Sequence, residues 1–184
     1  SVMVFETVHR RGDGSLYPVE ARLQLVGQEE DKVFLAVIFD ITERKQAQLA
    51  LHSSEERYRA FVSNSTEGIW RFELDQPIST NLPVEEQIEH IFQRAYLAEC
   101  NDATARMYGL NSAEDLIGVR WKDMAGHDSR NIEFVRAVVE SGYRLVEAES
   151  FETDREGNVR RYMNSVVGVL ENAHIVRGWG VQRD

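Results

Sequence analysis

The sequence predicts an α+β fold, in which antiparallel strands form a sheet and short helices cover one of its faces. Three observations support this prediction. Short apolar runs bounded by turn residues, which are typical of strands, gather near both ends of the chain. Segments with apolar residues three and four positions apart, which are typical of amphipathic helices, lie between them. The strand pattern at the start also recurs at the end, which indicates two related units.

The first predicted elements are strands over residues 4–10, 16–26 and 32–40, separated by the turn sequences RRGDGS and GQEED. The third strand is apolar at every position from Val33 to Phe39, so both of its faces need burial. An exposed sheet of this kind is prone to aggregation. We therefore expect a second chain to cover it in a symmetric homodimer.

A charged helix is predicted next, over residues 42–60. Asp40 and Glu43 have the spacing of a capping box, in which two side chains satisfy free backbone N–H groups at a helix start. A narrow stripe of residues follows at four- and three-residue spacing, which suits a connecting helix that pairs with a second copy. An ordinary amphipathic surface helix is the alternative. The stripe consists of Ala47, Leu51, Ser54, Tyr58 and Phe61.

The central elements begin with a short strand over residues 67–74. Pro83 suits the first turn of a helix that continues to residue 94. One face of this helix is apolar, so we expect the helix to dock on the domain and Phe92 to be buried. That face carries Val84, Ile88, Ile91 and Phe92, and a strand over residues 96–100 follows.

The last elements are short helices followed by three strands. Asn101 or Asp102 caps a short helix that ends at Gly109, and residues 112–118 form another helix that ends at a glycine. The remaining elements are a helix over 129–142, with Ile132, Val135, Val138 and Val139 inward, and strands over 143–153, 159–170 and 175–183.

An internal repeat links the two ends of the chain. ETVHRRGDGSLYPVEARLQLV aligns with ESFETDREGNVRRYMNSVVGV, which places Gly14 on Gly157, and LAVIFD aligns with WGVQRD. Residues 1–41 are therefore predicted to be the last three strands of a unit whose complete form occupies residues 61–184. The helix over 42–60 then joins two copies of one kind of domain.

The composition of the chain excludes several classes of function and partner. The 184 residues carry a net charge of −10, whereas nucleic-acid binding needs clustered Lys and Arg. No apolar run approaches the roughly 20 residues of a membrane span, and no signal peptide is recognisable. The single cysteine, Cys100, excludes an internal disulfide and fits a reducing compartment. We therefore expect a cytoplasmic protein without nucleic-acid or membrane partners in this segment.

Catalytic patterns are missing from the sequence. It has no phosphate-binding glycine loop, no G-x-S-x-G nucleophile elbow and no Cys/His pair with zinc spacing. Paired carboxylates such as Glu85 and Glu86 lie in the first turns of helices, where they complement the helix dipole. We expect no enzyme activity and no metal site in this segment.

Two stretches carry a resemblance to a known family. IFDITERKQAQLALHSSEERYRAFVSNSTEGIW resembles the junction between tandem PAS domains of bacterial or archaeal signalling proteins such as sensor histidine kinases. AECNDATARMYGLNSAEDLIG is similar to the family's N-x-A-x-x-x-x-G-x-x-x-x-E-L-I-G region. The matching residues are Asn101, Gly109, Leu116, Ile117 and Gly118.

The resemblance implies a five-stranded antiparallel sheet with short helices on one face, preceded by a three-stranded half-domain and a linker helix. Residues 1–41 would be the C-terminal strands of a truncated PAS domain, 42–60 the linker, and 61–184 a complete PAS domain. The sequence departs from the family pattern near residues 75–95, where a helical insertion separates two strands that usually follow closely.

The resemblance also implies a sensory and interaction module of a larger signalling protein, with a histidine kinase or diguanylate cyclase output domain in the same chain. A ligand or partner would shift the sheet, and helices would pass the change on. A ligand-free dimerisation and spacing module is the alternative, and a haem or flavin redox or gas sensor is a weaker one. The expected transmission residues are Asp40, Ile41, Thr42, Glu43 and Asp184.

Cofactor use varies among members of the family. Blue-light members carry a cysteine in an Asn-Cys-Arg motif, whereas the corresponding stretch AGHDSRNIEF has none and Cys100 lies at a strand end. Haem-binding members use a histidine near the long helix, so His127 is the residue to consider, although a polar histidine followed by Asp128 is more often a helix-start residue. We expect no cofactor, and a cavity that is empty or holds a small metabolite.

Alternation along the strands and helices predicts which side chains line such a cavity. Asn164 is the most informative of them, because a buried amide needs a hydrogen-bond partner and a ligand can supply one. The apolar members fit an ordinary hydrophobic core as well. The candidate lining residues are Trp70, Met107, Trp121, Met124, Phe134, Phe151, Tyr162 and Asn164.

Overall fold

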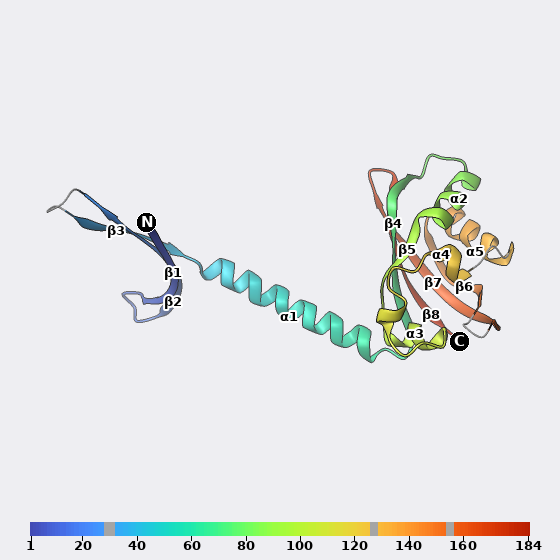
Figure 1. Ribbon diagram of the computed structural model, residues 1–184, viewed down its shortest axis with the longest axis horizontal. Helices are drawn as coiled ribbons and strands as arrows, with labels where there is room; N and C mark the ends of the chain where they lie inside the picture. Colours follow the sequence, from blue (N-terminus) through green and yellow to red (C-terminus); the bar gives the residue numbers. More distant parts are fainter. Residues whose placement is uncertain (28–31, 126–128, 154–156) are drawn as a thin grey trace. The chain divides into compact units, whose positions relative to one another are not determined.

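The structure, a computed structural model, describes residues 1–27, 32–125, 129–153 and 157–184 (Figure 1). The chain separates into two compact units, Ser1–Arg59 and Ala60–Asp184, each with its own antiparallel sheet. Among the described residues, no helix is long and apolar enough to cross a membrane.

The first unit is a three-stranded sheet followed by most of a long helix. Strands β1 (Val2–Arg10), β2 (Leu16–Val26) and β3 (Val33–Asp40) pair in sequence order, as predicted. Helix α1 spans Thr42–Asn64. All eight residues of β3 are exposed, although seven of them are apolar.

The second unit contains the five-stranded antiparallel sheet, in the order β5-β4-β8-β7-β6. The last strand of the chain, β8, therefore lies between β4 and β7 in the middle of the sheet. This places the C-terminal strand in direct contact with the strand that follows α1. The five strands are β4 (Gly68–Ser79), β5 (Ala95–Cys100), β6 (Arg144–Thr153), β7 (Val159–Glu171) and β8 (His174–Arg183).

Helices cover one face of this sheet, as Figure 1 shows for α2, α4 and α5. Phe92 on α2 is buried, which confirms that the inserted helix docks on the domain. The apolar face of α5 contributes Val135, Val138 and Val139 to the same core. The helices are α2 (Val84–Arg94), α3 (Asp102–Met107), the 3₁₀ turn η1 (Ala113–Asp115), α4 (Trp121–Ala125) and α5 (Ser129–Glu140).

The side chain of Asn101 forms hydrogen bonds that link the first elements of the second unit. Its side-chain amide donates to the backbone oxygens of Val62 (3.0 Å) and Glu67 (2.9 Å). Its side-chain oxygen accepts from the backbone N–H groups of Ile69 and Thr104, both at 3.0 Å. One buried side chain therefore caps α3 and fixes the end of α1 at the entry to β4.

Three elements differ from the sequence prediction. Strand β4 continues to Ser79, because its pairing with β8 shifts register between Glu73 and Ile78 and then resumes. The predicted helix over 112–118 is only a three-residue 3₁₀ turn. Helix α4 was not predicted, because five residues are too few to show a helical period.

Candidate functional site: an apolar cavity and a buried carboxyl group

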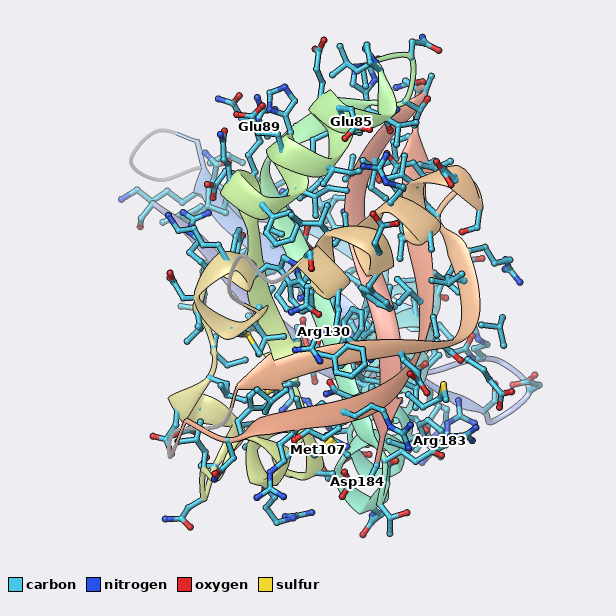
Figure 2. All side chains as sticks on the ribbon, turned by 90° about the vertical axis from the view of Figure 1, so that its right-hand side faces the viewer. Glu85, Glu89, Met107, Arg130, Arg183 and Asp184 are labelled. Carbon is cyan, nitrogen blue, oxygen red and sulfur yellow. The ribbon has the colours of Figure 1, made fainter. Side chains whose placement is uncertain are left out.

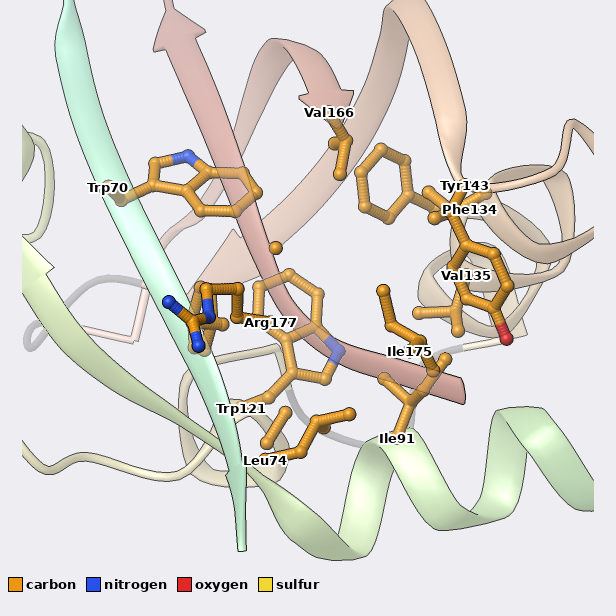
Figure 3. A pocket seen from close by; sticks show the side chains of 14 residues that line it. Trp70, Leu74, Ile91, Trp121, Phe134, Val135, Tyr143, Val166, Ile175 and Arg177 are labelled. Atoms are coloured by element: carbon orange, nitrogen blue, oxygen red, sulfur yellow. The ribbon is translucent and has the colours of Figure 1, made fainter. Parts of the chain in front are cut away.

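The second unit has an apolar cavity, partly open to solvent, between the sheet and helices α2, α4 and α5 (Figure 3). Its volume is about 90 Å³, counted as the space in which the centre of a water molecule fits. By this measure one water needs roughly 10–15 Å³, so the cavity has room for a small molecule. Its lining residues are Trp70, Phe72, Leu74, Ile91, Ala95, Trp121, Phe134, Val135, Val138, Tyr143, Val166, Ile175, Arg177 and Gly178.

Aromatic rings form one wall of the cavity. Phe72 lies edge-to-face against Trp70 and Trp121, with ring centroids 5.2 and 5.3 Å apart. Trp70 also lies directly on the backbone of Gly180, so closely that a Cβ there would collide with the indole ring. Glycine at this position of β8 therefore holds Trp70 in contact with the central strand of the sheet.

Few polar groups reach the cavity. The hydroxyl of Tyr143 donates to the side-chain oxygen of Gln87, and burial raises the pKa of Tyr143 to about 12. The Arg177 guanidinium faces two carboxylates, at 3.6 Å from Glu73 and 3.8 Å from Glu171. The indole N–H of Trp121 is buried without a hydrogen-bond partner among the described residues.

The second unit also contains a buried polar cluster around Glu152, and the residues of this cluster are not part of the cavity lining. The Glu152 side chain is 2% exposed, and burial raises its pKa to about 8. Ser150 Oγ donates to it at 2.8 Å, Gln182 Nε2 donates at 3.3 Å, and the Tyr108 hydroxyl is a third donor. These donors favour the charged carboxylate, but the loss of hydration outweighs them.

The structure brings three of the predicted lining residues to the cavity, namely Trp70, Trp121 and Phe134. Tyr162 and Asn164 are buried but do not line the cavity, and both form hydrogen bonds with protein groups. The Tyr162 hydroxyl donates to the Met107 carbonyl oxygen at 2.6 Å, and Asn164 Nδ2 donates to Ser150 Oγ at 2.8 Å. The predicted ligand partner of Asn164 is therefore a serine of the neighbouring strand.

Two further predicted residues, Met124 and Phe151, do not line the cavity. Met124 packs in the core. Phe151 pairs with Arg161, whereas Ser150 pairs with the buried Tyr162, so Phe151 lies on the opposite face of the strand pair. The cause is a bulge between Leu145 and Ala148, which shifts the in–out alternation of β6 by one residue.

Sequence reasoning missed the polar cluster and part of the lining. The helical period of α5 already indicated that Val135 and Val138 face inward. No local pattern indicated Glu152, because a glutamate in the run ESFET has the appearance of an exposed strand residue.

Of the two residues considered for a cofactor, the structure describes Cys100. Burial raises the pKa of the Cys100 thiol to about 11, and its Sγ donates to the carbonyl oxygen of Ala113 at 3.8 Å. Such a thiol is unreactive. His127 lies outside the described residues. Within those residues, no three His, Cys, Asp or Glu side chains are placed to hold a metal ion.

The predicted transmission residues lie at element ends. Asp40 Oδ1 accepts from the backbone N–H of Thr42 at 2.9 Å and from its hydroxyl at 2.6 Å, while Arg11 donates to Oδ2. These bonds lower the pKa of Asp40 to about 2. Ile41 is buried, and Glu43 lies in the first turn of α1. Asp184 follows β8, and Figure 2 shows it at the same end of the unit as Met107.

Comparisons with known proteins agree with this architecture. A family model described as PAS domain matches residues 1–43 and 89–184. No curated protein matches the chain in a sequence search.

Among solved structures, the PAS domain of a protein from Colwellia psychrerythraea is 19% identical, with a TM-score of 0.50 over 71% of this chain and 95% of that chain. The PAS domain of an HTR-like protein from Haloarcula marismortui is 16% identical, with a TM-score of 0.46 over 76% and 98%. A domain of a sensory box sensor histidine kinase/response regulator from Geobacter sulfurreducens is 18% identical, with a TM-score of 0.46 over 73% and 96%.

Proposed function

This chain belongs to the PAS domain family, and from this premise we propose that it is a sensory input module whose second unit responds to a small ligand. The observation that carries the proposal is that strand β8 forms part of the cavity wall through Ile175 and Gly178. A pocket lined by apolar and aromatic side chains is the usual form of a small-molecule site.

Strand β8 is the proposed route of the signal. A ligand that displaces Trp70 acts directly on Gly180, because the two are in contact. Two residues further on, Gln182 donates to Glu152, and the strand then leads to Asp184. A shift of β8 in the sheet therefore changes the position and polar contacts of the segment that leaves the domain.

The partners of the module follow from the same proposal. We propose a cytoplasmic, non-catalytic module that regulates an output domain of the same protein, such as a histidine kinase or diguanylate cyclase. Residues 1–41 are proposed to be the last strands of a preceding PAS domain, joined by residues 42–60. The exposed apolar residues of β3 support a homodimer, because a second chain can cover them.

One observation favours the second candidate, a ligand-free dimerisation and spacing module. The cavity of about 90 Å³ is smaller than the engineered cavity of about 150 Å³ that binds benzene. A space of this size accommodates only a small ligand.

Native mass spectrometry of freshly purified protein distinguishes the two candidates. A sensory module with a resident ligand shows a mass excess that disappears on denaturation. The matched control is Gly178→Val, since a Cβ at Gly178 meets no heavy atom within 4 Å and the side chain fills the cavity. Loss of the mass excess in this variant supports the cavity as the site. Retention of the excess places the ligand elsewhere, and no excess in either protein favours the spacing module.

A further inference from the structure

We propose that the ligand is a small, neutral, mainly apolar molecule with one hydrogen-bond acceptor, such as a short-chain ketone or ester. The indole N–H of Trp121 would donate to that acceptor. This inference rests on the proposed function, in which the cavity takes a ligand, and it names the chemistry of that ligand.

The donor that needs a partner is Trp121 Nε1. The Trp121 side chain is 8% exposed, and its Nε1 atom has no hydrogen-bond partner among the described residues. Buried donors in folded proteins nearly always have a partner. In Figure 3 the nitrogen edge of this indole is turned toward Ile175, whose side chain has no polar atom. A ligand acceptor bound in the cavity would accept a hydrogen bond from this N–H group.

A water molecule is a poorer occupant than a carbonyl compound. A buried water typically makes two to four hydrogen bonds, whereas the described lining offers only two buried side-chain donors without a partner, Trp121 Nε1 and Arg177 Nε. The Tyr143 hydroxyl donates to Gln87, and the Arg177 guanidinium faces Glu73 and Glu171. A ketone oxygen needs only one donor, and its alkyl groups replace water against the apolar wall.

The same environment disfavours an anionic ligand. A carboxylate would leave water for a largely hydrocarbon lining, in which the buried side-chain donors without a hydrogen-bond partner among the described residues are Trp121 Nε1 and Arg177 Nε. Burying an ion without adequate pairing is strongly unfavourable. The one cation of the lining, Arg177, already has two carboxylates within 4.0 Å. The ligand is therefore neutral.

The volume limits the size of the ligand. A cavity of about 90 Å³ is smaller than the engineered cavity of about 150 Å³ that binds benzene, so its ligand is no larger than benzene. This corresponds to a molecule with at most about six non-hydrogen atoms. We therefore take 2-butanone as the probe, with butyrate as its anionic counterpart and xenon as an apolar probe without an acceptor.

The experiment is an NMR titration of the full chain that follows indole N–H and side-chain methyl signals. The protein has three tryptophans, and Trp179→Phe is the matched control because Trp179 does not line the cavity. Binding of 2-butanone is expected to move the Trp121 indole proton downfield and to weaken roughly three- to tenfold in Trp121→Phe, the range of one neutral hydrogen bond. Xenon makes no hydrogen bond, so it is expected to lose no affinity in Trp121→Phe, and butyrate is expected to bind more weakly than 2-butanone.

Different failures have different meanings. If 2-butanone shifts the cavity methyls but leaves the Trp121 indole proton unmoved, the acceptor inference is wrong while the ligand site stands. Tighter binding of butyrate overturns the neutral character. If neither xenon nor 2-butanone shifts any cavity methyl, the proposed function fails as well. The indole shift is measured on the wild-type protein, so the test does not depend on the folding of Trp121→Phe.

Discussion

Replacement of Glu152 by glutamine is expected to change how stability depends on pH. Burial raises the pKa of this carboxyl from 4.5 to about 8. The folded state therefore holds a proton between these pH values that the unfolded state has released. The resulting stability is fully present below pH 4.5 and is lost as the pH rises through 8.

The magnitude follows from the pKa change. One pKa unit corresponds to about 1.4 kcal/mol, so the complete change corresponds to a loss of up to about 5 kcal/mol between pH 4.5 and 8. Glutamine has nearly the same shape and still accepts from Tyr108 and Gln182, but it does not titrate. The variant is therefore expected to match the wild type within about 1.5 kcal/mol at pH 5 and to exceed it by several kcal/mol at pH 8.5.

Urea unfolding at pH 5 to 8.5, followed by tryptophan fluorescence, measures this difference. Trp70, Trp121 and Trp179 all lie in the second unit, so the signal reports on the unit that contains Glu152. Glu149→Gln removes an exposed carboxyl from the same strand and serves as the control. A difference between wild type and Glu152→Gln that does not change with pH would refute the reasoning, because Glu152 would then titrate alike in the folded and unfolded states.

Four further predictions follow from the packing and composition. Phe92→Ala is expected to cost about 3–5 kcal/mol and to lower the melting temperature by roughly 10 °C or more, whereas the exposed Phe61→Ala changes it little. Gly180→Ala should destabilise by about 1–3 kcal/mol because its Cβ meets the Trp70 ring, while Gly178→Ala, with free space, should not. Light scattering is expected to show a dimer for the full chain and a monomer for residues 61–184; a monomeric full chain defeats the proposed role of β1–β3. The purified protein is expected to be colourless, and a haem or flavin absorption band would contradict this.

Local patterns predicted most of the fold. Alternating and continuous apolar runs located all eight strands. The period of residues 83–94 and 129–142 located helices α2 and α5 and the burial of Phe92. These features depend on residues close together in the chain. Turn residues also marked the strand ends in both units.

The site depended more on tertiary structure. The bulge before Ala148 places Phe151 on the face opposite to the predicted one. It arises where Glu147 has a positive φ of 53°, and the sequence has no glycine or asparagine at that position to indicate such a backbone conformation. Glu152 became buried because Tyr108, Ser150 and Gln182, from separate elements, supply its hydrogen bonds. Contacts between residues this far apart in the sequence cannot be predicted from the spacing of residues along the chain.

The central claim, that an occupied cavity changes strand β8, is tested most directly by amide hydrogen exchange of residues His174–Arg183. The measurement is made with and without a saturating probe, xenon or 2-butanone, in the wild type and in Gly178→Val. The account predicts altered exchange along β8 in the wild type and no alteration in the variant, whose cavity is filled. Unaltered β8 exchange in a wild-type protein whose cavity methyls show the probe to be bound would contradict it.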